Sequence, residues 1–348
     1  MIILNSDNKD HRAIWISLVE KELAGEPMLL PSYLELFCSA GDKAMCAFGE
    51  FNSGKILYPF IKRIIPGVRD VFDLTSSYGY GGPCVIGCVS SEEKATFWSS
   101  TQTAAGEANV VSEFIRFMLG REEECDYPGQ IVKRSSNVIR LLDIDLDTMW
   151  MEFGHKIRKN VIKASSFDLQ FVVDKGENLE DFMRIYYSTM DRCDAKENYY
   201  FKRDFYEKLN TELTNHAIYF YVLKDGQVIS TELVLYGKEN MYSYLGGSMS
   251  EFFYMRPNDF LKYEIIRWGH EKGIQNYILG GGYKGDDGIF RYKQNFAPEG
   301  VVKFFTGQRV FDQEKYEKLV SLRNKKAIRE GGEPVSGETH SFFPLYRV

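Results

Sequence analysis

Two cations and an amide lie close together in the last quarter of the sequence, at Arg291, Lys293 and Asn295. Successive side chains of an extended strand point to opposite faces, so a strand over residues 289–296 would put all three on one face. Ammonium and guanidinium groups placed in this way can stabilise a negative oxygen in a reaction intermediate or bind a phosphate. A basic strand face in contact with solvent fits the same pattern equally well.

A glycine-rich stretch precedes these residues and reads Gly280-Gly-Gly-Tyr-Lys-Gly-Asp-Asp-Gly288. Glycine allows backbone conformations closed to other residues and lets a ligand approach the chain, so Gly281 and Gly282 are candidates for a phosphate cradle. The lysine and hydroxyl residue of a P-loop do not follow at the required spacing, and a plain turn fits better. Asp287 is a candidate acceptor for a substrate proton, although turn carboxylates are more commonly only solvated.

The elements that must position these residues form an ordered series in the second half of the sequence. Alternating and helical apolar patterns predict helix, strand, two helices, a three-stranded meander, helix and strand. The corresponding ranges are 148–164, 168–173, 179–192, 202–213, 217–223, 227–236, 241–245, 258–272 and 276–279. Asn258 fits the N-cap of the last helix, and Gly273 fits its end.

The first half has a similar plan. Its pattern predicts a helix, a hairpin across Asn52-Ser-Gly54, a second helix and a strand, with ranges 13–24, 43–51, 55–63, 107–119 and 137–144. A weak echo between Tyr78-Gly-Tyr-Gly-Gly82 and Tyr242-Ser-Tyr-Leu-Gly-Gly247 suggests duplication. We therefore expect an α/β (α+β) chain with domains at 1–145 and 146–325. The active site would lie in a cleft between them, and the tail, 326–348, would dock through its aromatic residues.

Length and composition set the class of protein. A chain of 348 residues with 44% apolar and 26% charged residues suits a globular protein of two domains. A net charge of -6 argues against a protein that coats nucleic acid, including DNA, and still permits a local basic patch. No stretch reaches the roughly 18–20 apolar residues of a membrane span, and we expect a cytoplasmic protein. The cysteines and histidines show no metal-ligand spacing, so no metal site is expected.

The ordered set of motifs resembles the FemAB family of peptidoglycan bridge-forming aminoacyltransferases and related acetyltransferases of the GNAT superfamily. The motifs are Pro59-Phe-Ile-Lys-Arg63, Tyr78-Gly-Tyr-Gly-Gly-Pro83, Arg158-Lys-Asn160, Tyr242-Ser-Tyr244, Pro257-Asn-Asp-Phe-Leu261 and Gly280–Phe296. The resemblance implies tandem GNAT-like domains, each with a mostly antiparallel sheet flanked by helices. It also implies transfer of an amino acid from aminoacyl-tRNA to an amine of a cell-wall or surface-polysaccharide precursor.

The resemblance also implies roles for individual residues. Lys293 occupies the family's lysine position, where it would meet the carbonyl oxygen or the donor's terminal phosphate; Arg291, Tyr244 and Asp287 are the other catalytic candidates. The candidates for substrate binding are Lys62, Arg63, Tyr78, Tyr80, Arg116, Arg158, Lys159, Asn160, Tyr242, Asn258, Gly281, Gly282, Tyr292 and Phe296. Lys156 and Lys163 lie on the same basic helix face and are further candidates for phosphate binding.

The acyl donor stays open at this stage. The donor would be a co-substrate rather than a tightly bound cofactor, either aminoacyl-tRNA or an acyl-CoA or acyl carrier protein thioester. The glycines of a CoA pyrophosphate loop are missing near 246–259, which disfavours ordinary CoA binding. The acceptor would be an amine-bearing sugar or peptide precursor. A non-catalytic glycan- or nucleotide-binding module is the alternative from another class.

Overall fold

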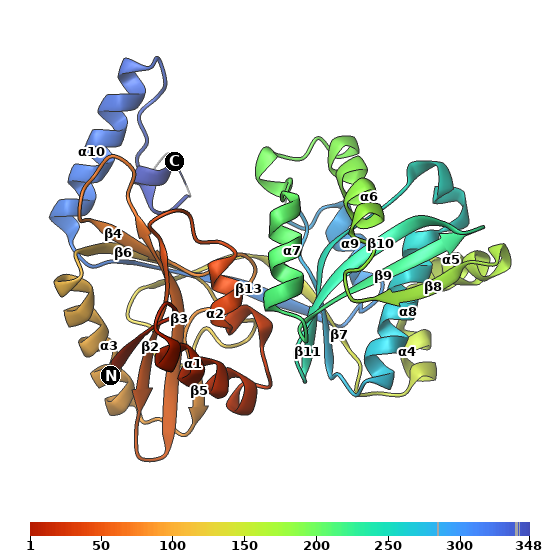
Figure 1. The fold of residues 1–348 in the computed structure, drawn as a ribbon, viewed down its shortest axis with the longest axis horizontal. Coiled ribbons are helices and arrows are strands. Elements are labelled where there is room, and N and C mark those ends of the chain that lie inside the picture. The colour runs from red at the N-terminus through yellow and green to blue at the C-terminus, as the bar shows by residue number, and fades with distance from the viewer. Residues whose placement is uncertain (284, 338–339, 341) are drawn as a thin grey trace. The chain divides into compact units, whose positions relative to one another are not determined.

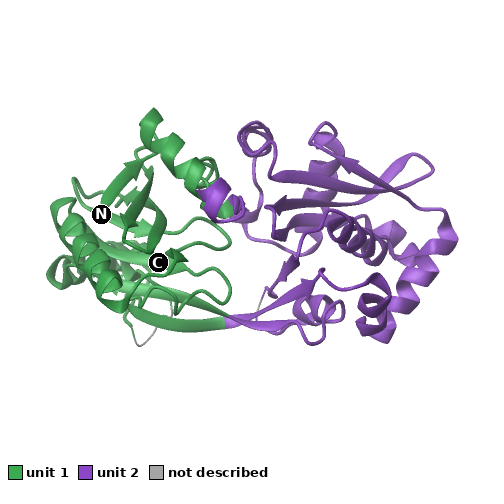
Figure 2. Cartoon of the chain, turned by 90° about the horizontal axis from the view of Figure 1, so that it is seen from below, with its two compact units in different colours: residues 1–18, 28–134, 304–348 green, residues 19–27, 135–303 purple. Residues whose placement is uncertain are grey.

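The structure is a computed structural model that describes residues 1–283, 285–337, 340 and 342–348 (Figure 1). Lys284 of the glycine-rich stretch and residues 338, 339 and 341 of the tail lie outside the described residues. Contacts divide the chain into two compact units (Figure 2). Unit 1 contains Met1–Leu18, Met28–Arg134 and Phe304–Val348, and unit 2 contains Val19–Pro27 and Ser135–Lys303.

Unit 1 is built on strands in the order β1-β2-β3-β4-β6-β13, with β5 paired to β3. Its strands are β1 (Ile2–Asn5), β2 (Lys43–Glu50), β3 (Gly54–Ile64), β4 (Phe72–Thr75), β5 (Cys84–Gly87), β6 (Val110–Arg116) and most of β13 (Val301–Val310). Its helices are most of α1 (Lys9–Glu22), α2 (Pro31–Glu35), α3 (Ser91–Glu107) and α10 (Gln313–Arg329). Aromatic side chains dominate its core, among them Tyr58, Phe97, Trp98 and Phe117.

Unit 2 has strands in the order β7-β12-β11-β10-β9-β8, and the chain enters it through β7 and leaves it through β13. The strands are β7 (Gln130–Leu141), β8 (Gln170–Asp174), β9 (Ala217–Lys224), β10 (Gln227–Tyr236), β11 (Asn240–Ser248) and β12 (Asn276–Gly280). The helices are α4 (Leu146–Glu152), α5 (His155–Ala164), α6 (Leu179–Arg192), α7 (Arg203–Glu212), α8 (Pro257–Glu271) and α9 (Gly288–Gln294). The core of unit 2 includes apolar side chains of α4, α5 and α8 and of the central strands.

Strands β11 and β12 run parallel but separate after a short contact. Only three residue pairs join them, and the last is Tyr242 with Ile278. Beyond that pair β11 continues to Ser248 beside β10, whereas β12 ends at Gly280. The backbone pairing of the two strands therefore ends in a fork between Ser243 and Gly281.

The α/β fold of tandem sheet units flanked by helices was expected from the sequence and is confirmed. The hairpin of β2 and β3 and the meander of β9, β10 and β11 have the antiparallel pairing that their turns predicted. Docking of the tail is also observed, since Tyr346 packs against Ile65, Val111 and α10. In the described residues, no helix has the length and apolar content of a membrane span.

The structure corrects several expected elements. Residues 110–116 form strand β6, not part of a helix over 107–119, because the β-branched and aromatic residues of this run favour a strand and most of the run is buried in the sheet. The helix expected at 148–164 is broken at Phe153 and Gly154, where the φ and ψ angles leave the helical region. Helix α8 begins at Pro257, and Arg256 rather than Asn258 holds the N-cap position.

The two units also differ from the contiguous stretches 1–145 and 146–325. Strand β13 returns the chain to unit 1, where it pairs with β6, and helix α10 follows it there. Residues 304–348, including the expected tail, are thus part of unit 1. The short segment Val19–Pro27 of the N-terminal part belongs to unit 2. There Glu26 accepts a hydrogen bond of 2.7 Å from Tyr242.

Candidate functional site

Helix α9 replaces the extended segment expected at 289–296, and the prediction of a strand face is wrong. The Asp287 carboxylate caps the helix by accepting hydrogen bonds from the backbone N–H groups of Ile289 and Phe290, at 2.9 and 3.0 Å. Phe290 and Phe296 are both buried in the core of unit 2. An alternating pattern suits a strand, but these caps and core contacts favour a helical turn instead.

Lys293 projects from α9 to the mouth of the fork. Its Nζ donates a hydrogen bond of 2.7 Å to the carbonyl oxygen of Gly281, directly beyond the end of β12. Burial and then the nearby charge of Lys262 lower the pKa of Lys293 to about 8, against opposing effects of Glu232 and Asp287. At neutral pH the ammonium form of Lys293 is therefore the major one, and the neutral amine forms at slightly alkaline pH.

This lowered pKa has a consequence for stability. Between pH 8 and 10.5 the folded chain binds fewer protons at Lys293 than the unfolded chain, so folding is favoured as pH rises through that window. Relative to Lys293→Met, the wild type should gain about 1–2 kcal/mol between pH 7 and pH 10.5, after allowance for solvent screening. Urea unfolding of both proteins at the two pH values measures this difference. A constant difference would show that the ammonium of Lys293 is not perturbed.

Gly282 of the loop is required because other atoms of the loop lie very close to its Cα. A Cβ atom on Gly282 would collide with the carbonyl oxygen of Gly285 and with the Asp287 carboxylate. Asp287 also accepts a hydrogen bond of 2.8 Å from the backbone N–H of Tyr283. The carboxylate thus organises the loop that presents Gly281 to Lys293.

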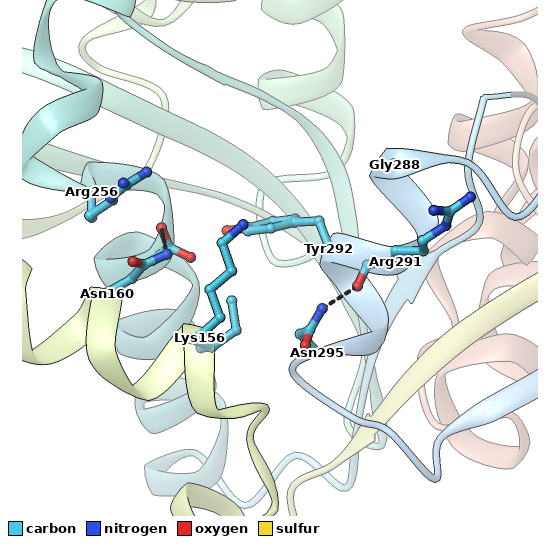
Figure 3. Close-up of a pocket in the computed structure, with 9 residues that line it drawn as sticks. Lys156, Asn160, Arg256, Gly288, Arg291, Tyr292 and Asn295 are labelled. Carbon is cyan, nitrogen blue, oxygen red and sulfur yellow. Dashed lines mark hydrogen bonds between the residues drawn. The ribbon is translucent and has the colours of Figure 1, made fainter.

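A pocket of about 270 Å³ lies in unit 2 beside α9. It is lined by Lys156, Ile157, Asn160, Arg256, Asp259, Gly288, Arg291, Tyr292 and Asn295. Figure 3 shows Lys156 reaching toward Tyr292, with Arg256 on one side and Arg291 on the other. Three cations and one carboxylate make the lining electropositive, which suits a phosphate-bearing ligand.

Two buried polar atoms of this pocket have no hydrogen-bond partner in the described parts of the chain. They are Oδ1 of Asp259, a residue only 6% exposed, and Nε of Arg256. Burial raises the pKa of Asp259, while the hydrogen bond from Asn160 and the charges of Arg256 and Lys156 lower it. A buried polar atom without a partner costs free energy, so the pocket is arranged for a ligand that both accepts and donates hydrogen bonds.

Tyr292 lines the pocket and also interacts electrostatically with Glu232 near the fork. Its hydroxyl accepts a hydrogen bond of 2.8 Å from the Asn258 amide, and its ring packs against Phe296. Burial raises the pKa of Tyr292, and the charges of Asp259 and Glu232 raise it further. The hydroxyl therefore stays protonated and lies within the electrostatic reach of carboxylates in both regions.

The structure brings together eight of the sequence candidates in unit 2. They are Asn160, Asn258, Gly281, Gly282, Asp287, Arg291, Tyr292 and Lys293. Two others are core residues, because Phe296 is fully buried and Tyr242 is held by Glu26. Tyr244 is half-buried on β11, and Arg158 donates to the carbonyl oxygen of Met151 at 2.5 Å. Lys159 is exposed on α5.

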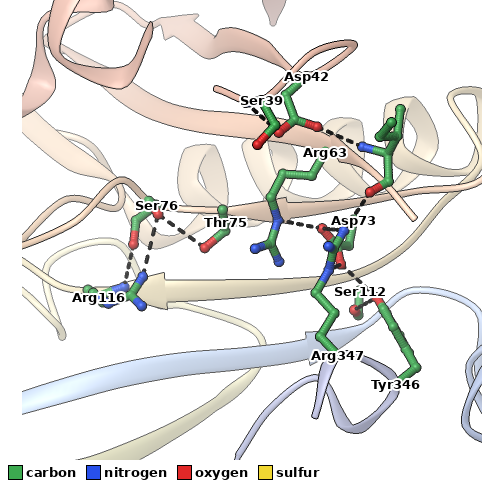
Figure 4. Close-up of polar contacts among 11 residues, drawn as sticks. Ser39, Asp42, Arg63, Asp73, Thr75, Ser76, Ser112, Arg116, Tyr346 and Arg347 are labelled. Carbon is green, nitrogen blue, oxygen red and sulfur yellow. Dashed lines mark hydrogen bonds and ion pairs between the residues drawn. The ribbon is translucent and has the colours of Figure 1, made fainter. Parts of the chain in front are cut away.

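The remaining candidates belong to unit 1, and Figure 4 shows two of them, Arg63 and Arg116. Arg63 and Arg347 both bind the buried Asp73 carboxylate, at 2.8 and 2.5 Å. Arg116 lies over the Phe114 ring, and burial, followed by the charge of Arg63, lowers its pKa to about 10. Lys62 lies over the ring of Phe72, with its Nζ 3.8 Å from the ring centroid. Tyr78 is 37% exposed, whereas Tyr80 packs edge-on against Phe304.

Sequence reasoning missed Arg256, Asp259 and a buried polar network of Glu232, Ser243, Lys262 and Tyr277. Two signals for the network are present in the sequence. Glu232 directly precedes the apolar run Leu233–Leu235 in β10, and Lys262 lies on the apolar face of α8 beside Leu261 and Ile265. A charged residue at a buried position of each of two elements indicates an ion pair, but the pairing itself needs the fold.

A comparison with known protein families finds a match in the part of the chain that contains this site. Residues 152–294 match the family model described as acetyltransferase (GNAT) domain. No curated protein sequence matches the chain significantly. FemX shares the fold at 14% identity, with a TM-score of 0.68 over 88% of this chain and 97% of FemX. The resemblance expected from the sequence is thereby confirmed.

Two further solved structures have the same fold. L-PGS from Bacillus licheniformis has 12% identity and a TM-score of 0.56, over 86% of this chain and 91% of that one. A tandem GNAT protein from the clavulanic acid biosynthesis pathway has 9% identity and a TM-score of 0.50, over 89% and 98%.

Proposed function

The chain carries an acetyltransferase (GNAT) domain within the fold of FemX, and we propose that this acyltransferase forms amides at the fork between β11 and β12. The donor is an ester or thioester with a phosphate-bearing carrier, and the acceptor is an amine. In the reaction the amine attacks the acyl carbonyl, and the ester or thioester bond breaks as the amide bond forms.

The observation that carries this proposal is the position of Lys293. Its ammonium donates a hydrogen bond to Gly281 at the mouth of the fork, and burial, which lowers the pKa of Lys293, leaves the charge incompletely solvated. An incompletely solvated cation interacts strongly with a negative oxygen that forms on the carbonyl in the tetrahedral intermediate. We assign Lys293 this stabilising role, with Asp287 and the loop glycines holding it in place.

The pocket beside α9 is the proposed site for the carrier. Lys156, Arg256 and Arg291 would bind phosphate oxygens, and Asp259 would accept a hydrogen bond from a hydroxyl or amide N–H of the same ligand. Aminoacyl-tRNA fits these features and is the donor we propose. An acyl-CoA or acyl carrier protein also has a phosphate and an amide N–H, and it remains the alternative. The acceptor we propose is an amine on a cell-wall or surface-polysaccharide precursor.

In unit 1 the charged group around Arg116 is the proposed binding site for the acceptor. Its guanidinium donates a long hydrogen bond of 3.5 Å to the carbonyl oxygen of Ser76, and no carboxylate pairs with it in the described residues. A partly buried arginine without a carboxylate is suited to an anionic ligand. Arg63 and the aromatic side chain of Tyr78 would complete that site.

Replacement of Arg291 by methionine tests the carrier site. The KM for the donor should rise about 10-fold while kcat changes by less than about 3-fold, because the removed contact is with a part of the donor that does not react. The salt dependence of donor binding should weaken as well, since one phosphate contact is lost.

The control for this experiment is Arg267→Met. It removes the same charge from unit 2, at a residue of α8 that pairs with Glu264 and does not line the pocket. Steady-state kinetics with aminoacylated RNA, acyl-CoA and acyl carrier protein at several salt concentrations give the comparison. Equal effects of the two substitutions would remove the pocket from donor binding.

A further inference from the structure

Two tyrosines from separate segments of unit 2 contact each other at the glycine-rich loop. Tyr283 belongs to this loop and is 50% exposed, and Tyr199 is a half-buried residue of the 3-10 helix η3 (Glu197–Tyr199). Their ring centroids are 6.2 Å apart, and the ring planes are inclined by 62°. We call Tyr199 and Tyr283 the aromatic pair. Both residues keep part of their surface in contact with solvent, where a ligand can reach them.

Hydrogen bonds hold the backbone of both members in place. The Asp287 carboxylate accepts a hydrogen bond of 2.8 Å from the backbone N–H of Tyr283. Helix α6 holds the other member, because the Tyr186 hydroxyl donates to the carbonyl oxygen of Tyr199 at 2.9 Å. A surface that is already arranged loses little conformational freedom when a ligand binds. The aromatic pair is therefore suited to recognition of a substrate.

The aromatic pair is also connected to the proposed point of reaction. Tyr283 follows Gly281 by two residues, so their Cα atoms are at most about 7.6 Å apart. The Gly281 carbonyl oxygen accepts the hydrogen bond from Lys293 Nζ at 2.7 Å. Asp287, which binds the backbone of Tyr283, also caps α9, the helix that carries Lys293. Tyr283 and Lys293 thus belong to one local structure.

The charges near the aromatic pair differ from those of the pocket beside α9. Residues 191–199 include three carboxylates and two cations, whereas the pocket lining has three cations and one carboxylate. The carboxylate of Glu197 is exposed and has neither a hydrogen-bond nor an ion-pair partner in the described chain. The phosphates of a carrier are therefore attracted to the pocket, and a cationic group is attracted to the aromatic pair. A primary amine is protonated to a large extent at neutral pH, so the acceptor is the cationic substrate.

A ring-shaped acceptor matches this surface better than a linear one. The face of an aromatic ring is negative and attracts both a cation and the weakly positive C–H groups of a ring that lies against it. A sugar ring has several C–H groups on one face and hydroxyl groups at its edge. The exposed Glu197 and Asn198, which directly precede Tyr199, offer hydrogen-bond acceptors and a donor for such hydroxyls. A linear side chain that ends in an amine covers only part of one aromatic ring.

We propose that the aromatic pair binds the acceptor of the reaction and that this acceptor is an amino sugar. This proposal rests on the proposed function and names the acceptor for it. The sugar ring lies against the face of Tyr283, with Tyr199 as a second wall, and the amine attacks the acyl carbonyl at the fork. The amine forms the amide bond and releases one proton to water. The carbonyl–carrier bond breaks, and the leaving oxygen or sulfur takes up one proton.

Replacement of Tyr283 by alanine tests the aromatic pair, with glucosamine as the acceptor and the donor that supports transfer. The KM for glucosamine should rise at least about 5-fold, because a contact with a part of the acceptor that does not react is lost. The value of kcat and the KM for the donor should stay within about 3-fold. Tyr283→Phe keeps the ring and should keep the KM for glucosamine near that of the wild type. Tyr199→Ala should raise this KM as well.

Tyr254→Ala is the matched control. Tyr254 is a 54% exposed tyrosine of unit 2 that does not line the pocket, and its ring centroid lies 5.7 Å from that of Phe167. A short peptide with one lysine is the second acceptor, and its KM should change by less than about 3-fold in Tyr283→Ala. Equal effects of Tyr283→Ala and Tyr254→Ala would overturn the proposal, and so would equal effects of Tyr283→Ala on the two acceptors.

The outcomes separate the acceptor site from the function on which it rests. If the wild type forms an amide with the peptide but not with glucosamine, or if Tyr283→Ala raises the KM for glucosamine less than about 5-fold, the acceptor site is overturned and the function stands. Saturation-transfer NMR measures glucosamine binding without turnover. If the wild type forms no amide with any donor, the function is contradicted. Glucosamine binding that is lost in Tyr283→Ala would then still support an amino-sugar site, and no binding would overturn both proposals.

Discussion

Replacing Lys293 by methionine is expected to lower kcat about 10²–10³-fold, the usual effect of removing a group that stabilises the oxyanion. The methionine keeps most of the length and volume of the side chain, so α9 and its cap at Asp287 should stay intact. The KM for the donor should change little, because the oxyanion forms only in the transition state. In the wild type, kcat/KM should fall as pH rises above about 8, where the ammonium is lost.

Lys272→Met is the control for this experiment. It removes a cation from the end of α8, where Lys272 lies near Trp268 and away from the pocket. Circular dichroism and thermal unfolding establish that both variants are folded, and kinetics from pH 6 to pH 10 give the comparison. A Lys293→Met protein with wild-type kcat would exclude Lys293 from the reaction.

Replacing Lys262 by methionine should lower the free energy of unfolding by about 3–5 kcal/mol. The substitution leaves the Glu232 carboxylate buried without its cation, and breaking one side of a buried ion pair has this typical cost. Urea unfolding followed by circular dichroism and by tryptophan fluorescence measures the loss. Unit 2 contains Trp150 and Trp268, so the fluorescence change should include this unit.

The double substitution Lys262→Met with Glu232→Leu is the informative control. Since both charges are removed and the volumes are similar, most of the lost stability should return. A single Lys262→Met variant that loses less than about 1 kcal/mol would show that the pair is not charged in the folded protein.

Local sequence patterns predicted much of the fold correctly. The turn at Asp225-Gly226 and the alternation of apolar residues around it gave strands β9 and β10, and Gly273 marked the end of α8. These features depend on residues close together in the chain. Lys293 and the glycine-rich stretch belong to one motif of the sequence, and the hydrogen bond from Lys293 to Gly281 joins the two parts of that motif.

Local sequence patterns failed where contacts with distant segments determine the structure. Phe290, Tyr292 and Phe296 are two and four residues apart, a spacing that suits one face of a strand, but Phe290 and Phe296 are buried in the core and the segment is helical. The pairing of Lys262 with Glu232 joins residues on α8 and β10, and no local rule relates them. The observed unit boundaries differ from the expected ones for the same reason, since β13 brings residues 304–348 back to β6.

The most direct test of the central claim is a product assay with a panel of donors. The purified chain is mixed with a primary amine acceptor and, in turn, with aminoacylated RNA, acyl-CoA and acyl carrier protein, and mass spectrometry measures the amide. We expect one class of donor to give product with the wild type, and at least 100-fold less with Lys293→Met. Absence of amide with every donor, or equal product from the two proteins, would contradict the proposal that this fork is an acyltransferase site.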